Sequence, residues 1–237
     1  MMKIILAKRL KRIAEELEES SRKAALANFL GVEPDDIQDG YDEYHFDVPG
    51  EGEFAVYTDD EADNEFARQM EEFIDEMGIS GFSKNFQEQI KSSYLNENWF
   101  CEALEELDMG YCEDIASEPD GEFGNRLVHE CYDAGLVNDE DFDVDENGDP
   151  DFSKCNKYAD ELTDLYVEWR SKGENCVERF RNELGDEELD IAIKENNLLD
   201  SAKIIEAVKE SDGRGPTLAP YDGNENENGD YFIYRVG

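Results

Sequence analysis

Residues 143–151 have the spacing of oxygen side chains that opens an EF-hand calcium loop. The first, third, fifth and sixth positions of such a loop fall on Asp143, Asp145, Asn147 and Gly148, which suit calcium coordination and a sharp turn. The twelfth position requires a bidentate glutamate and holds Lys154. We therefore favour a solvated turn, with calcium binding as the weaker alternative. The candidate calcium ligands are Asp143, Asp145, Asn147, Asp149 and Asp151.

The histidines and cysteines do not have the spacing of a metal centre or of a catalytic nucleophile. His129 and Cys131 could contribute to a zinc site with Cys112 or Cys155, but no strong zinc motif is present. A nucleophile elbow, a phosphate-binding loop and a dinucleotide fingerprint are also missing. We therefore expect no cofactor and no enzymatic activity. The five cysteines are odd in number and widely spaced, which predicts reduced thiols in a cytosolic protein.

Acidic residues dominate the composition. The chain has 63 Asp and Glu against 22 Lys and Arg, for a formal net charge of −41. Broad contact with phosphates requires Lys and Arg, so the composition excludes direct nucleic-acid binding and disfavours an anionic membrane surface. No apolar run approaches the roughly 18 to 20 residues of a membrane helix. The short apolar run at 4–6 is followed at once by Lys8 and Arg9, which is unlike a secretory signal.

The excess charge is concentrated in the middle of the chain. Residues 24–153 contain 39 acidic and only 4 basic side chains. Self-repulsion on this scale destabilises a compact fold. A general halophilic adaptation fits poorly, because 12 Lys accompany 10 Arg and halophilic chains usually avoid Lys. The pattern favours a negative surface that itself serves the function.

Apolar residues recur near a period of 3.6 in several segments, which predicts helices. The first covers residues 3–30, and a second begins after Thr58, which forms a capping-box pattern with Glu61. Apolar faces at 99–107 and 127–132 mark two more. Further helices are expected, after a loop at 139–153, over residues 155–171, 174–184, 187–198 and 200–210.

Three segments alternate polar and apolar residues as strands do. Residues 41–48 and 53–58 flank a Pro-Gly-Glu-Gly turn and predict a hairpin. A lone hairpin is marginal, so we expect 231–236 to join it. The predicted class is α+β, with a small antiparallel sheet of about three strands, including the C-terminal one, and a mostly helical, strongly acidic body. One domain is expected over 1–237, most acidic in 24–153, helical in 154–210, and closing with a loop and strand at 211–237.

Two of the predicted helices carry carboxylates three and four residues apart without compensating Lys. Such like-charge pairs cost helix stability, and a solvated face normally mixes signs. A face of a single sign therefore indicates a binding surface. On the first helix the candidates are Asp59, Asp60, Glu61, Asp63, Glu65, Glu71, Glu72, Asp75 and Glu76. On the second they are Glu97, Glu102, Glu105, Glu106, Asp108, Glu113 and Asp114.

The amount of charge suggests what such a surface could imitate. Duplex DNA carries one charge per about 1.7 Å of axis, so a charge of −41 corresponds to roughly 70 Å of duplex. An acidic surface entering the basic channel of a nucleic-acid-binding protein would gain from the counterion release and steering that DNA exploits. We therefore expect the partner to be a host nucleic-acid-binding protein with a basic channel.

Two stretches resemble acidic, mostly uncharacterised bacteriophage proteins. One is residues 55–68, from Ala-Val-Tyr-Thr to Phe-Ala-Arg, and the other is the ending between Tyr221 and Arg235. In overall charge the chain is also similar to phage DNA mimics that block restriction enzymes, CRISPR effectors or DNA-repair enzymes. The resemblance implies a phage-encoded inhibitor of host defence in the host cytoplasm. It brings no catalytic residues with it.

Three functional interpretations follow. The preferred one is a non-enzymatic, phage-type inhibitor of a host defence protein that acts by DNA mimicry. The alternative is an acidic protein–protein adaptor or replication accessory that does not compete with DNA. The third is a small enzyme or calcium-binding protein whose acidity is incidental.

Overall fold

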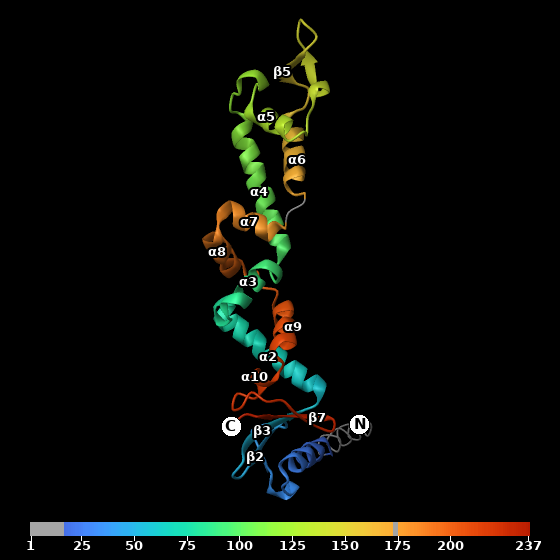
Figure 1. Ribbon diagram of the computed structural model, residues 1–237, viewed down its shortest axis with the longest axis vertical. Helices are drawn as coiled ribbons and strands as arrows, with labels where there is room; N and C mark the ends of the chain where they lie inside the picture. The colour runs from blue at the N-terminus through green and yellow to red at the C-terminus, as the bar shows by residue number, and fades with distance from the viewer. Residues whose placement is uncertain (1–16, 173–174) are drawn as a thin grey trace, which may run out of the picture. The chain divides into compact units, whose positions relative to one another are not determined.

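The computed structural model describes residues 17–172 and 175–237, and these divide into two compact units (Figure 1). Unit 1 comprises Met1–Ser83 and Ser201–Gly237, and unit 2 is Lys84–Asp200. Hydrophobic clusters lie within each unit. The expected α+β class is confirmed. That both units behave as the single domain expected over 1–237 stays a prediction.

An antiparallel sheet forms the centre of unit 1. Its strand order is β1-β2-β3-β7-β6, and β3 and β7 pair through Ala55 with Tyr234 and Val56 with Ile233. The expected union of the hairpin with the C-terminal strand is therefore confirmed, and two short edge strands add to it. The strands are β1 Gln38–Asp39, β2 His45–Val48, β3 Gly52–Tyr57, β6 Asn226–Asn228 and β7 Tyr231–Arg235.

Both faces of this sheet are covered, because its central strands carry apolar residues on either side. Phe54, Val56 and Ile233 pack with Leu26 of the helical segment 17–30. Their neighbours in the strands point the other way and pack against α2 (Asp59–Met77) and α10 (Gly215–Leu218). The C-terminal strand thus contributes to the clusters on both faces of the sheet, through Ile233 on one face and Tyr234 on the other.

Helix α2 begins where the sequence predicts. Thr58 is its N-cap, and the Glu61 carboxylate accepts a hydrogen bond from the Thr58 backbone N–H at 2.7 Å, as a capping box requires. Ala62, Phe66, Met70 and Ile74 are its buried residues, at every fourth position. The opposite side therefore faces solvent. The remaining elements of unit 1 are η1 Pro34–Asp36, η2 Gly78–Gly81 and α9 Ser201–Asp212.

Unit 2 consists mainly of helices around a core of Cys112, Leu127, Cys131 and Leu162. Its longest described helix is α4 (Glu97–Ala116). None of the helices in the part of the chain that the structure describes is long and apolar enough to cross a bilayer. The other elements are α3 Lys84–Ser93, η3 Gly121–Phe123, α5 Arg126–Asp133, η4 Asp139–Asp141, α6 Ala159–Arg170, α7 Cys176–Leu184 and α8 Asp186–Asn196.

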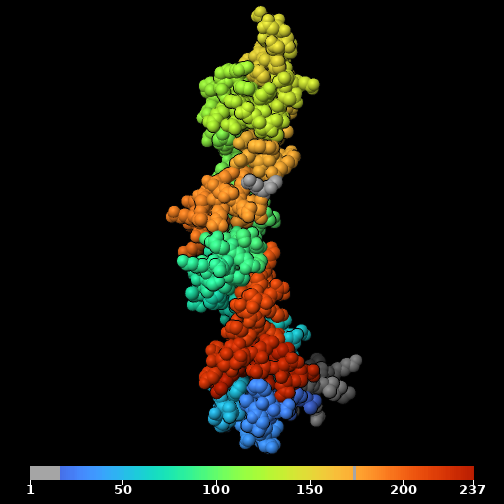
Figure 2. Space-filling model, viewed as in Figure 1, coloured from blue at the N-terminus to red at the C-terminus, as the bar shows by residue number. Residues whose placement is uncertain are grey.

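Four expectations about local structure need correction or completion. The expected loop at 139–153 contains a hairpin of β4 (Phe142–Val144) and β5 (Pro150–Cys155), whose tip extends beyond the helices of unit 2 (Figure 1, Figure 2). Helix α6 consequently begins later than the expected residue 155. Helix α3 was not anticipated. The first helix is confirmed over 17–30, and its expected part at 3–16 lies outside the described residues.

The expectation of five reduced thiols is wrong for two of them. Cys101 of α4 and Cys176 of α7 form a disulfide, with Cα atoms 5.2 Å apart and a sequence separation of 75. Cys112, Cys131 and Cys155 are free thiols. The pairing could not be inferred from spacing, because helix packing alone brings the two positions together.

Candidate functional site

Helix α4 presents a stripe of carboxylates on the side opposite its buried face. Phe100, Leu104 and Cys112 are buried within unit 2. The exposed carboxylates follow at spacings of three, four and seven residues, which keeps them on one side of an α-helix. We name this set the α4 stripe. Its members are Glu102, Glu105, Glu106 and Glu113.

The α4 stripe is not neutralised within the part of the chain that the structure describes. None of its members forms an ion pair there, and the last turn of α4 contains no basic residue. Carboxylates near a helix C-terminus oppose the helix dipole, and Glu113 and Asp114 lie close to that end. The helix therefore carries these charges at a cost to its own stability.

The linear charge density of the α4 stripe is roughly 0.6 of that of a single phosphate strand. Glu102 and Glu113 are eleven residues apart, which at 1.5 Å per residue is about 16 Å along the axis. Three intervals separate the four carboxylates over this length, so their mean axial spacing is about 5.5 Å, against about 3.4 Å for the phosphates of one DNA strand. The helix does not reach the density of a duplex.

The C-terminal half of α2, in unit 1, has a similar acidic cluster. Glu71, Glu72, Asp75 and Glu76 are exposed, and the last turn of α2 contains no basic residue. Arg68 bonds Glu72, with 2.5 Å between the guanidinium nitrogen and the carboxylate oxygen. This cluster is therefore partly neutralised, whereas the α4 stripe is not.

The N-terminal half of α2 uses its acidic residues within the fold. Arg214 is buried and donates to Asp59 and Asp63, each at 2.8 Å. Lys209 also contacts Asp63, at 2.7 Å. Of the candidates in this half, Asp60 is exposed without an ion pair to the described residues. Asp59 and Asp63 thus anchor α2 to the C-terminal segment of unit 1.

Two glutamates of α2 are likewise engaged by arginines. Arg22 holds Glu61 at 2.7 and 2.8 Å, and Arg68 holds Glu65 at 2.6 and 2.9 Å. Burial acts to raise the pKa of Glu61, but the bonds from Arg22 and Thr58 outweigh it and hold that pKa below its ordinary value. The bonds from Arg68 likewise hold the pKa of Glu65 below its ordinary value. These carboxylates stabilise the fold and are half-buried.

Asp108 is not on the surface, so its assignment to the exposed acidic face is wrong. It is 3% exposed, and both its carboxylate oxygens accept hydrogen bonds from Nη2 of the buried Arg179, at 2.6 and 2.7 Å. Arg170 approaches it at 3.5 Å, and both arginines also pair with Glu183. The four side chains form a charge-balanced network that joins α4, α6 and α7.

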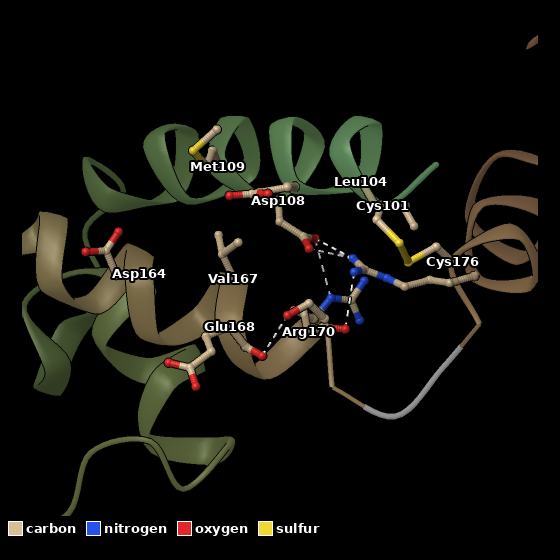
Figure 3. A pocket seen from close by; sticks show the side chains of 12 residues that line it. Cys101, Leu104, Asp108, Met109, Asp164, Val167, Glu168, Arg170 and Cys176 are labelled. Carbon is tan, nitrogen blue, oxygen red and sulfur yellow. Dashed lines mark hydrogen bonds and ion pairs between the residues drawn. A yellow bond between two sulfur atoms is a disulfide. The ribbon is translucent and has the colours of Figure 1, made fainter. Parts of the chain in front are cut away.

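A cavity of about 360 Å³ lies beside this network (Figure 3). Its wall contains the disulfide of Cys101 and Cys176, and Asp108 and Arg179 bond to each other at its edge. Glu105, Asp164 and Glu168 add further carboxylates to the lining. This cavity could not be inferred from the sequence, because helix packing brings residues of α4 together with residues of α6 and α7, which lie far from α4 in the chain.

The candidate calcium loop is the turn of the β4–β5 hairpin. The carboxylate of Asp145 accepts hydrogen bonds from the backbone N–H groups of Asn147 and Asp149, at 2.7 and 3.0 Å. Asp151 pairs with Lys154 at 2.7 Å. Asp143 belongs to β4, and Asn147 and Asp149 are exposed in the turn. The flanking elements are strands, whereas an EF-hand loop lies between helices, so the preferred interpretation as a solvated turn agrees with this geometry.

The residues considered for zinc do not meet. His129 bonds Asp120 at 2.6 Å and stacks on Phe123, while the Cys131 thiol donates to the carbonyl of Leu162 at 3.7 Å. Burial raises the pKa of Cys112 to about 11 and that of Cys131 to about 12, which keeps both as thiols. Among the described residues, the one cluster with ligand atoms close enough for a metal is Glu97, Cys101 and Cys176.

Comparison of the chain with protein-family models, with curated proteins and with solved structures finds no match.

Proposed function

We propose that this protein is a non-enzymatic inhibitor that enters the nucleic-acid-binding channel of another protein. The carboxylates of the α4 stripe take the place of the phosphates of one nucleic-acid strand and meet Lys and Arg of the partner. Direct binding of nucleic acid is not part of this function, because the chain has 63 acidic and 22 basic residues.

The observation that carries the proposal is the α4 stripe itself. Its charges are exposed, of one sign, and unpaired within the described residues. They repel one another within a helix, and Glu113 also opposes the dipole at the C-terminal end of α4; both effects lower stability. A surface kept at such a cost is accounted for by a partner of the opposite charge, which would relieve the repulsion on binding.

The resemblance to phage proteins narrows the partner further. It supports a host defence protein that acts on nucleic acid, such as a restriction or CRISPR protein, with the inhibitor made in the host cytoplasm. The exposed acidic cluster of α2 supplies a second surface for the same partner or for another copy of it. Both of these points rest on the proposal for α4.

Competition with DNA is the direct test. The protein is immobilised and incubated with a nuclease-treated bacterial lysate, and the captured proteins are identified. The leading one is then purified, and its binding is measured with and without a 20-bp duplex, about two turns of DNA, at two salt concentrations. We expect the duplex to displace the protein and the affinity to fall steeply with salt, as it does for DNA.

A charge-reversed variant and a matched control locate the surface. The test variant changes four residues to Lys: Glu102, Glu105, Glu106 and Glu113. The control also changes four exposed glutamates of unit 2 to Lys: Glu140, Glu146, Glu188 and Glu195. Both variants change the net charge equally. We expect the α4 variant to lose at least about a hundredfold in affinity, because like charges would face each other across the interface, and the control to lose far less.

Two results would contradict the proposal. Simultaneous binding of DNA and this protein to the partner would favour an adaptor that does not compete with nucleic acid. Equal losses in the two variants would show that net charge alone drives the association and that α4 has no special part in it.

A further inference from the structure

Three potential metal ligands of unit 2 lie together at the junction of α4 and α7. Glu97 and Cys101 are four residues apart and therefore share one side of α4. Cys176 is the first residue of α7, and its backbone N–H donates to the Glu97 carboxylate at 3.4 Å. One ligand atom from each side chain lies within 4.8 Å of the other two. The packing of two helices thus brings together a cluster of ligands that could not be predicted from a sequence motif.

The two sulfurs are joined in the structure, and a disulfide sulfur is a poor metal ligand because the thiolate is the binding form. Reduction would change this. A thiol or phosphine reductant supplies two electrons, and with two protons the S–S bond becomes two S–H groups. When a phosphine is used, it leaves as the phosphine oxide with an oxygen atom taken from water.

We propose that Cys101, Cys176 and Glu97 form a binding site for a thiophilic divalent cation, such as Zn²⁺, when the disulfide is reduced. Two thiolates and one carboxylate are ligands that Zn²⁺ accepts, with one position left for water. Binding releases two protons, one from each thiol. The metal-bound and disulfide forms are therefore alternatives at the same pair of sulfurs.

The local geometry suits this ligand set. Ligands at about 2.0 to 2.3 Å from a tetrahedral zinc are roughly 3.3 to 3.8 Å apart, so atoms within 4.8 Å need only small side-chain rotations. The Cα atoms, 5.2 Å apart, need not move far for the sulfurs to separate. The N-terminus of α7 also favours negative charge at Cys176.

The cavity gives the metal a path to the sulfurs. Cys101 and Cys176 both line it, and Glu105, Asp164 and Glu168 form part of its wall. Figure 3 shows the disulfide beside this space. The lining contains four carboxylates, of Glu105, Asp108, Asp164 and Glu168, and two guanidinium groups, of Arg170 and Arg179, so a cation entering the cavity meets more negative than positive charge.

Cobalt(II) and cadmium(II) are suitable probes, because thiolate coordination gives each a charge-transfer absorption that oxygen ligands do not give. The full-length protein is reduced with a phosphine, freed of reductant and titrated anaerobically with each metal. We expect one equivalent to bind with thiolate absorption, and the air-oxidised protein to show none.

Four variants separate this site from the other thiols. Cys101→Ser and Cys176→Ser should each raise the Kd at least about tenfold, a change of about 1.4 kcal/mol. Glu97→Gln keeps both thiols and the disulfide, so it tests the carboxylate without altering the covalent link, and it should also weaken binding. Cys155→Ser removes a half-buried free thiol and should leave binding unchanged.

Several outcomes would overturn the proposal. They are equal metal binding by the oxidised protein, no thiolate absorption after reduction, and loss of binding in Cys155→Ser instead of Cys101→Ser. The metal titration does not involve a protein partner, so failure of the metal-site proposal would not bear on the proposed inhibitor function. Failure of the inhibitor proposal would likewise not bear on the metal site.

Discussion

Replacing Asp108 by Asn should destabilise unit 2 strongly, although Asp108 is one of seven acidic residues on α4 that look alike in sequence. The change preserves the shape of the side chain and removes its charge. Both carboxylate oxygens are held by Arg179 at 2.6 and 2.7 Å, and the two residues are 3% and 5% exposed. The variant would therefore leave a buried guanidinium without its closest counter-charge.

The size of the effect follows from this burial. Removing one partner of a buried ion pair costs about 3 to 5 kcal/mol. Arg179 would keep Glu183, at 2.9 Å, so we expect the lower end, about 3 kcal/mol. For a unit of this size, that corresponds to a fall in Tm of roughly 10 °C. Burial disfavours the charge on Arg179, but its bonds to Asp108 and Glu183 outweigh this effect and raise its pKa. The variant removes the bond to Asp108. A guanidinium nevertheless stays protonated in proteins, so the cost of the buried charge remains.

Urea unfolding followed by circular dichroism would measure the difference, with Glu105→Gln as the control. Glu105 is three residues away on the same helix, is exposed and has no ion pair to the described residues. Its neutralisation should change the free energy of unfolding by less than about 0.5 kcal/mol, or raise it by relieving repulsion. Equal changes in the free energy of unfolding for the two variants would refute the buried network and would indicate that Asp108 is exposed to solvent.

Three further predictions concern the whole chain. Reduction of Cys101–Cys176 should lower the free energy of unfolding by about 4 kcal/mol, because the disulfide closes a loop spanning 75 residues; an unchanged urea midpoint with phosphine would show that the bond does not form in solution. The Tm should rise from low to moderate ionic strength as repulsion within a net charge of −41 is screened, and a constant Tm would indicate locally neutralised carboxylates. In acid, unit 1 should lose stability. Burial acts to raise the pKa values of Glu61, Asp63 and Glu225, but the bonds from Arg22, Lys209 and Arg214 outweigh it and lower these pKa values overall. The stability that these carboxylates contribute is therefore complete above the ordinary carboxyl pKa of about 4 and is lost as the pH falls through the lowered values. Glu61→Gln should flatten this acid limb, whereas Glu71→Gln should leave it unchanged.

The sequence by itself determined much of the local structure and the class of the fold. The capping box at Thr58 and the apolar spacing after it gave α2 correctly, because both are properties of neighbouring residues. The alternation in 53–58 and 231–236 likewise gave β3 and β7, and the instability of an isolated hairpin gave their pairing. The β4–β5 hairpin was missed because its Asp- and Asn-rich residues have the composition of a loop.

The tertiary structure alone decided which acidic residues serve the fold and which remain exposed. Asp108 and Glu105 have the same sequence surroundings, yet one faces Arg179 from α7 and the other faces solvent. In sequence, nothing distinguishes Asp59, Glu61 and Asp63 from Glu71 and Asp75. In the structure, Arg22 and Arg214, which belong to segments far from α2 in the chain, bond to the first three. The same holds for the Cys101–Cys176 pair. An ion pair or a disulfide depends on the distance between two side chains, and helix packing sets that distance for residues far apart in the chain, where local spacing has no influence.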